Sequence, residues 1–462
     1  MKITVFGAGY VGLVTSVCFA DLGNEVLCVE KSLPKLEKLN KGISPIYEVG
    51  ITEILQRNIK EGRLSFTDDI KEAVNFSDVI FICVGTPQNE KGEADLSQVE
   101  DVVKSVSQYM DGYKLIIEKS TVPVNTHKWI ENIINESLSK PIEFDIASNP
   151  EFLKEGTSIY DFMNPNRIIV GVESKKAEDV FKKLYEPFIR KGHFLFITTP
   201  AEAELIKYAS NSFLALKISY TNMLAQLCEK VEANIEEVSY GIGLDDRIGT
   251  HFLNAGIGYG GSCLPKDVRA FINTADEYGI KFYILKEAER VNLDIRHHFV
   301  QKIKKTLKSG NINNIAIWGL SFKPNTDDIR DAPSITIVNE LSKSNVNLRL
   351  YDPEAIENFK VLFPENENIK YFDNKYDALN GVDALIINTE WSEFTDADLY
   401  EMIKIMKMPI IMDGRNIYDL EIMNKLGIEY YSIGRNDVSR RDNDIIEDIS
   451  LTLTTNSKFE TK

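Results

Sequence analysis

A glycine-rich turn near the start of the chain restricts the fold more than any other feature. Residues 2–6 (KITVF) form a β-rich run, and GAGYVG follows at residues 7–12. A stretch of helical composition comes next, closed by Gly23, and a second β-rich run over residues 25–29 ends at Glu30. The order strand, glycine turn, helix, strand and acid is typical of a dinucleotide-binding α/β fold.

The spacing within this turn also indicates its ligand. Gly7 permits the tight turn, Gly9 lets the backbone approach a pyrophosphate, and Gly12 lets the helix pack closely on the strand. Glu30 would accept hydrogen bonds from a ribose 2′-hydroxyl and repel a 2′-phosphate, so we expect NAD rather than NADP. The alternative is a βαβ turn without a ligand. The expected cofactor contacts of the turn are Gly7, Gly9, Tyr10, Val11 and Gly12.

Further β-rich runs follow at intervals that fit helices, which predicts a parallel sheet covered on both faces. These runs are residues 78–85, 113–121, 144–148 and 166–171. In such sheets, ligands bind at loops that follow the strands. Two of these loops, GTP at 85–87 and STVP within 118–124, are candidates to contact the cofactor through Thr86 and Thr121.

A long stretch without glycine or proline runs from Ala201 to just before Gly241. Its apolar residues recur at helical spacing, which predicts one long helix that forms a spine between domains and a dimer seam. Lys207 and Asn211 are four residues apart and share one face. A lysine ordinarily faces solvent, but apolar neighbours such as Phe213 predict a mostly buried helix, so that both side chains point inward to something anionic. The apolar positions include Leu205, Ala209, Phe213, Leu216 and Tyr220.

Near Asn311 the alternation of strands and helices begins again without a GxGxxG turn, and one run ends in an acid, Asp352. The β-rich runs are residues 312–320, 346–353, 382–390 and 409–415. We predict an α/β fold with two Rossmann-like doubly wound domains joined by a long central helix and a helical dimerisation region. The expected domains are residues 1–200 for NAD binding, 201–308 for dimerisation and active-site residues, and 309–462 for the second Rossmann-like half. The polar residues 456–462 are expected to fray.

Composition excludes several classes of partner. The formal net charge of −17 argues against a nucleic acid or an anionic membrane, and no apolar run approaches the ~20 residues of a membrane helix. The 5 cysteines are scattered without CxxC spacing, which fits a reducing, cytoplasmic compartment better than a disulfide framework or a zinc site. The histidines form no ligand pattern, so we expect no metal.

One cysteine stands apart from the others. Four lie in predicted helices or strands, where buried cysteine commonly acts as a small hydrophobe: Cys18, Cys28, Cys83 and Cys228. Cys263 instead follows four glycines in GIGYGGSCLPKD (256–267), and Pro265 is expected to keep the chain from running straight into a helix. Such a loop would expose the thiol, with Lys266 and Asp267 just beyond it. The alternative is a tight turn that carries a thiol without using it.

Taken together, these motifs resemble the UDP-glucose/GDP-mannose dehydrogenase family over nearly the whole chain. The resemblance rests on GAGYVG, NPEFLKEG (149–156), LIKYASNSFLALKI (205–218), GLDDRIG (243–249), GIGYGGSCLPKD, FKPNTDDIR (322–330) and DGR (413–415). NPEFLKEG favours the UDP-glucose branch, as does Ser262, where the N-acetylmannosamine branch usually has histidine. The chain departs from the family at Glu30, Ala255 and Met223, where aspartate, proline and an acidic residue are common.

The resemblance implies that C6 of UDP-glucose is oxidised twice, from alcohol to acid, while two NAD are reduced. A thiolate would capture the aldehyde as a thiohemiacetal, and a second hydride transfer would give a thioester that water hydrolyses. Cys263 would be this nucleophile. Lys207 and Asn211 would stabilise the developing oxyanion, and Asp267 would help to activate the hydrolytic water.

The resemblance also assigns the remaining site residues. Glu151 with Thr121 would transfer protons through a water. Glu155 would lie at the nicotinamide end, and the other implied NAD contacts outside the glycine turn are Lys35 and Arg330. The implied substrate contacts, besides Lys207 and Asn211, are Phe152, Leu153, Lys154, Arg247 across the dimer seam, Phe252, Leu253, Asn254, Gly258, Lys323 and Arg415. The domain at 309–462 would bind the UDP-sugar, and a homodimer is expected.

Three other functions remain open from the sequence. The substrate could be a UDP-N-acetyl-hexosamine or GDP-mannose. A two-electron hydroxyacid dehydrogenase would also join a Rossmann domain to a long helix with lysine and asparagine, but it needs neither Cys263 nor a second Rossmann-like half. A non-enzymatic NAD-binding protein would tolerate loss of Lys207, Asn211, Cys263 and Asp267.

Overall fold

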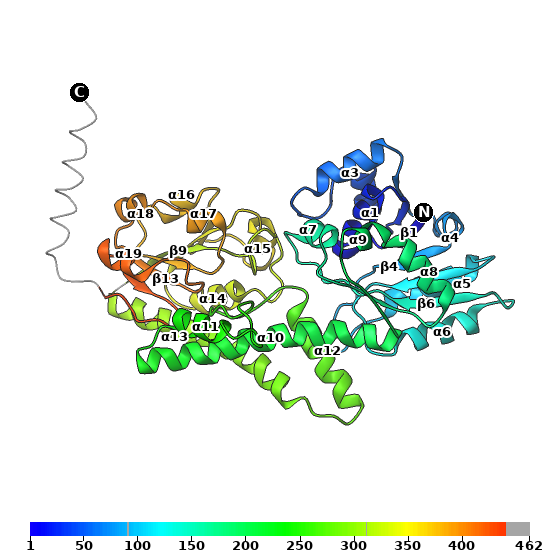
Figure 1. Cartoon of the computed structure of the whole chain (residues 1–462). Coiled ribbons are helices and arrows are strands. Elements are labelled where there is room, and N and C mark those ends of the chain that lie inside the picture. Colours follow the sequence, from blue (N-terminus) through cyan, green and yellow to red (C-terminus); the bar gives the residue numbers. More distant parts are fainter. Residues whose placement is uncertain (90–91, 311, 440–462) are drawn as a thin grey trace. The chain divides into compact units, whose positions relative to one another are not determined.

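The structure, a computed structural model, describes residues 1–89, 92–310 and 312–439 (Figure 1). It divides into two compact units, Met1–Phe213 with Lys266–Phe282, and Leu214–Pro265 with Tyr283–Lys462. The expectation that residues 456–462 fray lies outside the described residues. Two helices, α10 (Pro200–Val231) and α12 (Leu264–Glu277), contribute residues to both units.

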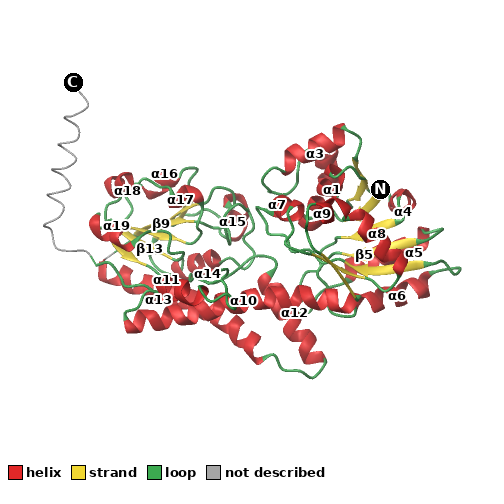
Figure 2. Ribbon diagram, viewed as in Figure 1, coloured by secondary structure: helices red, strands yellow, loops and turns green. Residues whose placement is uncertain are grey.

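The first unit is built on an eight-stranded sheet in the order β3-β2-β1-β4-β5-β6-β7-β8 (Figure 2). Its strands are β1 (Lys2–Phe6), β2 (Glu25–Val29), β3 (Leu64–Thr67), β4 (Val79–Ile82), β5 (Lys114–Glu118), β6 (Phe144–Ser148), β7 (Ile168–Gly171) and β8 (Leu195–Thr198). The prediction of a wholly parallel sheet is wrong at one place, since β6 and β7 pair antiparallel through Ser148 and Gly171. A parallel neighbour needs a crossover that covers the sheet, whereas residues 149–167 between these strands hold only one short helix.

Helices cover both faces of this sheet, as predicted. Alternate strand residues enter different cores: Ile3 and Val5 pack into a cluster with α1 residues, and Phe6 packs into another with residues of α5 and α6. Strands buried on both faces are typical of doubly wound sheets. The helices are α1 (Tyr10–Asp21), α2 (Leu33–Asn40), α3 (Ile51–Lys60), α4 (Ile70–Phe76), α5 (Ser97–Tyr109), α6 (Thr126–Ser137), α7 (Ser158–Met163), α8 (Lys175–Leu184) and α9 (Glu186–Arg190).

The second unit holds a six-stranded sheet, all parallel, in the order β11-β10-β9-β12-β13-β14. Its strands are β9 (Asn314–Trp318), β10 (Asn347–Tyr351), β11 (Ile369–Tyr371), β12 (Ala384–Ile387), β13 (Ile410–Asp413) and β14 (Glu429–Tyr431). Its helices are α11 (Ile235–Gly243), α13 (Tyr283–Gly310), α14 (Pro333–Leu341), α15 (Ile356–Leu362), α16 (Lys375–Leu379), α17 (Ser392–Thr395), α18 (Leu399–Ile405) and α19 (Leu420–Lys425). The predicted second doubly wound sheet is therefore confirmed.

Asp352, the acid at the end of the second predicted strand of this half, binds backbone groups of its own domain. Asp352 is buried just after β10, and its Oδ2 accepts hydrogen bonds from the backbone N–H groups of Leu320 (2.7 Å) and Ser321 (3.0 Å). Its Oδ1 accepts one from the N–H of Ala355 (2.8 Å). Asp352 thus organises the loop after β9, unlike the ligand-binding role predicted for Glu30.

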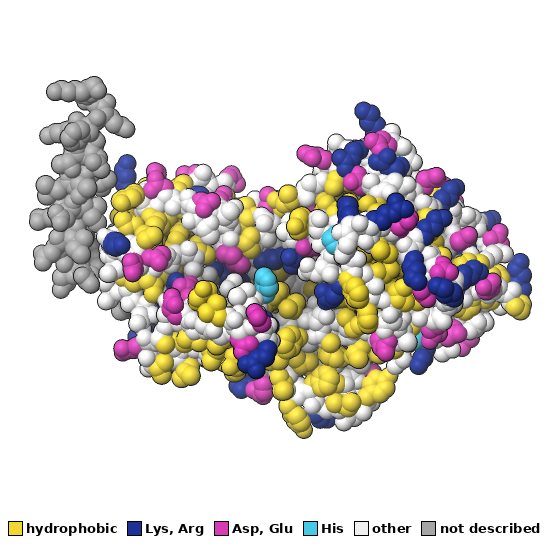
Figure 3. Space-filling view, in the orientation of Figure 1, with side chains coloured by type: hydrophobic (Ala, Val, Ile, Leu, Met, Phe, Trp, Pro, Cys, Tyr) yellow, Lys and Arg dark blue, Asp and Glu magenta, His cyan; other side chains and the backbone are white. Residues whose placement is uncertain are grey.

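The predicted long helix is confirmed as α10, but its burial differs from the prediction. Phe213 is 62% exposed, and Tyr220 is also exposed. Lys207 and Asn211 are buried, as predicted. The helical spacing of the apolar residues correctly predicted the helix. It did not show which face of the helix is covered by the rest of the chain. Figure 3 shows hydrophobic side chains at the surface over the region of this helix.

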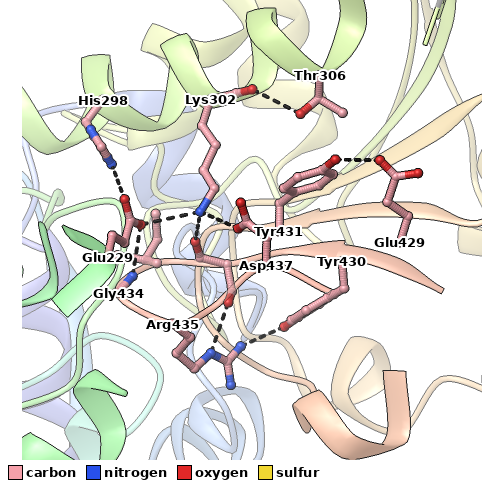
Figure 4. A network of polar contacts seen from close by, with 12 residues as sticks. Glu229, His298, Lys302, Thr306, Glu429, Tyr430, Tyr431, Gly434, Arg435 and Asp437 are labelled. Atoms are coloured by element: carbon pink, nitrogen blue, oxygen red, sulfur yellow. Dashed lines mark hydrogen bonds and ion pairs between the residues drawn. The ribbon is translucent and has the colours of Figure 1, made fainter. Parts of the chain in front are cut away.

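A polar network ties the chain after β14 to two helices of the second unit (Figure 4). Glu229 of α10 pairs with Nε2 of His298 at 2.8 Å and Nζ of Lys302 at 3.4 Å, and accepts the N–H of Gly434 at 3.1 Å. Lys302 also pairs with Asp437 at 2.8 Å. Burial raises the pKa of Glu229, but the hydrogen bond from His298 and the charge of Lys302 outweigh it and lower the pKa to about 2.

In the described residues, no helix is long and apolar enough to span a membrane.

Candidate active site

The glycine turn between β1 and α1 has the space that a bound dinucleotide requires. Gly7 has φ +98°, and a Cβ there would lie 2.8 Å from the carbonyl oxygen of Cys83. A Cβ at Gly12 would lie 1.8 Å from the carbonyl oxygen of Gly7, so this glycine allows the helix to fold back on the turn. At Gly9 a Cβ would meet nothing within 4 Å, which leaves open space at the helix N-terminus. The turn therefore fits a pyrophosphate held by backbone N–H groups.

The other predicted cofactor residues of the first unit follow strands of the same sheet. The turn lies where the strand order reverses between β1 and β4, the position at which doubly wound sheets bind their ligands. Glu30 directly follows β2 and is half-buried. After β4 and β5, the Oγ1 of Thr86 donates a hydrogen bond to the carbonyl oxygen of Thr121 at 2.8 Å, which brings these two predicted loops together. Lys35 lies exposed on α2.

Lys207 of α10 faces a carboxylate, as predicted for an inward-pointing lysine. Its Nζ lies 2.8 Å from Oε1 of Glu151 and donates to the carbonyl oxygen of the same residue at 2.8 Å. Glu151 Oε2 accepts the N–H of Leu153 at 2.6 Å. Burial raises the pKa of Glu151, but the Lys207 charge and these hydrogen bonds outweigh it, so the pKa lies below its ordinary value. Glu151 is therefore a buried carboxylate that is ionised beside the Lys207 ammonium.

One helical turn further along, Asn211 meets the second predicted carboxylate. Its Nδ2 donates to Oδ2 of Asp267 at 2.6 Å, and Lys266 pairs with Oδ1 at 2.8 Å. Asp267 is fully buried in the first turn of α12. The same face of α10 thus presents a lysine to one carboxylate and an amide to another.

The segment NPEFLKEG brings in a residue that the sequence did not single out. The guanidinium of Arg167 lies 4.0 Å from the centroid of the Phe152 ring, and Lys207 Nζ lies 5.5 Å from it. Arg167 also donates to Oγ of Ser210 on α10 at 3.2 Å. These contacts orient Phe152 by cation–π attraction. Lys154 at the segment's outer side is exposed and pairs with Asp161 at 3.4 Å.

In the second unit, neighbouring residues pack so closely against the loop GIGYGGSC that two of its glycines leave no room for a side chain. At Gly258 (φ +91°) a Cβ would lie 2.5 Å from Oδ1 of Asn292, and at Gly261 (φ +87°) it would lie 2.6 Å from the Phe322 ring. Asn292 accepts the N–H of Tyr259 at 2.8 Å and donates to its carbonyl oxygen at 3.0 Å. The loop is therefore fixed by close packing, and Asn292 is a further loop-positioning residue that the sequence did not reveal.

Arg415 and Gly258 are the two predicted substrate residues that the second unit brings into direct contact. The Nη1 of Arg415 donates to the carbonyl oxygen of Gly258 at 3.1 Å, and its Nε donates to that of Asn388 at 2.8 Å. The remaining predicted residues of this unit are placed as follows: Leu253 is buried; Phe252 (φ +64°) and Asn254 are exposed; Arg247 is exposed and pairs with Asp245; Lys323 lies 5.6 Å from the Phe322 ring; Arg330 pairs with Asp328.

Cys263 differs from the other cysteines, as predicted. It is half-buried, whereas Cys18, Cys28, Cys83 and Cys228 are buried, and burial raises the pKa of each of these four thiols. The expected effect of Pro265 is wrong, because α12 begins at Leu264, directly after Cys263. Proline is favoured in a first helical turn, where its missing N–H leaves no hydrogen bond unmade. Cys263 thus lies directly before the N-terminus of α12.

The fold and the glycine turn define a dinucleotide-binding α/β protein. Three family profiles match the chain: the NAD-binding domain over residues 1–189, the central domain over 201–294 and the UDP-binding domain over 316–420. The chain belongs to the UDP-glucose/GDP-mannose dehydrogenase family.

Individual relatives match almost end to end. The chain is 44% identical over 442 residues to a UDP-glucose 6-dehydrogenase of Rhizobium meliloti (strain 1021), covering 95% of this chain and 100% of the relative. A solved UDP-glucose dehydrogenase from Pyrobaculum islandicum has 35% identity and a TM-score of 0.84, covering 90% of this chain and 94% of that one. A solved UDP-D-ManNAc dehydrogenase from Pyrococcus horikoshii has 29% identity and a TM-score of 0.82, covering 94% and 99%.

Proposed function

We propose that this protein is an NAD-dependent dehydrogenase that oxidises C6 of UDP-glucose to the carboxylate of UDP-glucuronate. Relatives named for this reaction match nearly the whole chain at over 40% identity. The observation that carries the proposal is the face of α10 on which Lys207 meets Glu151 and Asn211 meets Asp267. A proton acceptor, a cation, an amide donor and a second carboxylate are the groups that a two-stage oxidation with a hydrolytic end requires.

The first oxidation needs a proton acceptor for the C6 hydroxyl. Glu151 is ionised and takes this proton through a water that Thr121 helps to orient. Bound NAD supplies the acceptor for the hydride that leaves C6 in each oxidation. The product of this step is a C6 aldehyde, which must not escape before the second oxidation.

Cys263 retains the aldehyde. Its thiolate adds to C6 and forms a C–S bond, while the carbonyl electron pair moves to oxygen, where Lys207 and Asn211 stabilise the charge. Loss of a second hydride from C6 gives a thioester. Water, activated by Asp267, adds to C6 and the C–S bond breaks, so the thiol is regenerated. One UDP-glucose, two NAD⁺ and one water thus give one UDP-glucuronate, two NADH and three protons.

The remaining contacts are proposed by motif. The NAD contacts are Gly7, Gly9, Tyr10, Val11, Gly12, Glu30, Lys35, Thr86, Thr121, Glu155 and Arg330. The UDP-glucose contacts, besides Lys207 and Asn211, are Phe152, Leu153, Lys154, Arg247, Phe252, Leu253, Asn254, Gly258, Lys323 and Arg415. The domains that carry them are residues 1–200, 201–308 and 309–462, and the enzyme acts in the cytoplasm.

The enzyme forms a homodimer through α10. Six large apolar side chains of this helix are more than two-fifths exposed: Leu205, Phe213, Tyr220, Met223, Leu227 and Val231. They recur at spacings of three, four, seven and eight residues, which places them along one stripe of the helix. A second copy of the same helix offers the matching stripe, as two-fold interfaces are self-complementary. Arg247 then reaches the substrate of the partner.

Oxidation of another nucleotide sugar is the second candidate, since the same fold is found in a UDP-D-ManNAc dehydrogenase. The sequence NPEFLKEG and Ser262 favour UDP-glucose. A panel of UDP-glucose, UDP-N-acetyl-hexosamines and GDP-mannose, followed by NADH absorbance, separates the two. The proposal expects kcat/KM to be highest for UDP-glucose, and a higher value for any other sugar would overturn it.

A further inference from the structure

A buried carboxylate outside the proposed machinery joins the glycine turn to the NPEFLKEG segment. Glu48 lies in the loop between α2 and α3 and is only 5% exposed. Its Oε2 accepts the N–H of Gly156 at 2.7 Å, and its Oε1 accepts the N–H of Ser158 at 2.8 Å. The hydroxyl of Tyr10 donates to Oε2 as well, and the N–H of Gly156 lies 3.0 Å from that hydroxyl.

The backbone at Gly156 is shaped for this carboxylate. Gly156 has φ +83°, a left-handed conformation that glycine adopts without strain. The N–H groups of Gly156 and Ser158 point toward one place and form an anion-binding site in the main chain, while the N–H of Thr157 between them donates to the carbonyl oxygen of Lys154 at 3.0 Å. A side-chain carboxylate of the same protein occupies this site, at the end of NPEFLKEG and just before α7.

Tyr10 connects Glu48 to the proposed cofactor site. It is the first residue of α1 and directly follows Gly9, whose open space receives the pyrophosphate in the proposed function. Glu155, proposed for the nicotinamide end, directly precedes Gly156. Glu48 therefore holds together Tyr10 and Gly156, which lie 146 positions apart in the sequence, and the segment around each carries proposed ligand contacts.

We propose that Glu48 is a positioning residue that fixes the cofactor turn and the NPEFLKEG segment in one arrangement, so that NAD affinity and UDP-glucose affinity both depend on this carboxylate. This inference rests on the proposed function. Burial raises the pKa of Glu48, and the N–H donors of Gly156 and Ser158 oppose that shift. The charge-assisted bonds it accepts are stronger than neutral ones.

Glu48→Gln tests the proposal because the amide keeps the side-chain size but replaces one acceptor with an N–H₂ group, which would face a backbone N–H. We expect KM for NAD and KM for UDP-glucose each to rise about tenfold, with kcat within about twofold, since no reacting atom contacts Glu48. The matched control is Glu53→Gln on α3, an exposed carboxylate that should leave both KM values unchanged. A fluorescence titration of NADH without substrate measures the cofactor effect independently of turnover.

Tyr10→Phe provides a second variant that retains the packed ring. It removes only the hydroxyl, so NADH should bind more weakly, and adding Glu48→Gln should then cost less than it does in the wild type. Should Glu48→Gln fail to fold, NADH affinity of Tyr10→Phe within about twofold of wild type overturns the proposal.

The outcomes separate this inference from the proposed function. A Glu48→Gln protein that melts at a lower temperature but keeps both KM values and the NADH affinity would make Glu48 merely structural and overturn the proposal. A rise in only one KM would do the same. A wild-type protein that binds NADH but does not oxidise UDP-glucose refutes the proposed function, while the NADH titration still reads the effect of Glu48 on the cofactor turn.

Discussion

Lys207 and Glu151 form a buried ion pair in which the lysine Nζ lies 2.8 Å from the carboxylate Oε1 and 2.8 Å from the carbonyl oxygen of the same residue. Both side chains are almost fully removed from solvent. A buried pair of this kind contributes little to stability relative to apolar packing, because both charges must be desolvated. The pair is better explained by chemistry that needs a cation and an ionised acceptor side by side.

Loss of the Lys207 charge should therefore affect rate more than cofactor binding. We expect Lys207→Ala to lower kcat by about 10²–10³ because it removes one donor to the developing oxyanion. NADH affinity, measured by fluorescence, should stay near the wild-type value. Lys230→Ala on an exposed position of the same helix is the control and should retain full activity. A Lys207→Ala enzyme with wild-type kcat would remove this lysine from the mechanism.

Asp267 should matter at the end of the reaction. In Asp267→Asn the thiohemiacetal and thioester can still form, but the water that cleaves the thioester lacks its base. The mass of the intact protein, measured soon after mixing with UDP-glucose and NAD, should then rise by the mass of the bound uronyl group. Recovery of the unmodified mass together with wild-type turnover would argue against a hydrolytic role for Asp267.

The ion pairs of Glu229 should make stability depend on pH in a defined direction. Its folded pKa of about 2 lies below that of an unfolded glutamate, ~4.3, so its stabilising effect is present above ~4.3 and is lost as the pH falls toward 2. Glu229→Gln should lower the free energy of unfolding by about 1–3 kcal/mol at pH 7, and the difference should shrink at acid pH. Urea denaturation at several pH values measures this, with exposed Glu237→Gln as the control. A difference that is independent of pH would contradict the assignment.

The apolar stripe of α10 should govern the oligomeric state. Leu227→Asp places a charge at a position that is 56% exposed, so the folded chain should tolerate it, while a dimer interface should not. Sedimentation should show a dimer for the wild type and a monomer for the variant. Tyr240→Asp, also exposed but on α11, offers a comparison outside the stripe. A wild-type monomer would refute the dimer outright.

The sequence predicted those parts of the fold that local pattern determines. The glycine spacing gave the dinucleotide turn, and the apolar spacing gave the full length of α10. Four edge strands, β3, β8, β11 and β14, were not predicted. They are less buried than the similarly short β4, β7, β12 and β13, so, β8 apart, no continuous apolar run marks them in the sequence. The exposed side of α10 was misassigned since periodicity defines a face without saying what covers it.

The candidate site was predictable where a motif holds its residues together. Lys207 and Asn211 were found because four-residue spacing puts them on one face. Glu48, Arg167 and Asn292 were not found, because each acts through a contact with a segment distant in the sequence. Such pairs appear only once the chain is folded, and no local pattern distinguishes them from other polar residues.

The yield of NADH per UDP-glucose tests the central claim most directly. With limiting UDP-glucose and excess NAD, the account predicts two NADH for each UDP-glucose consumed by the wild-type protein, with UDP-glucuronate as the product. Cys263→Ala should form no thioester and should lose the conversion to UDP-glucuronate, while still binding NADH. One NADH per UDP-glucose in the wild type, or full conversion to the acid by Cys263→Ala, would contradict the covalent four-electron mechanism.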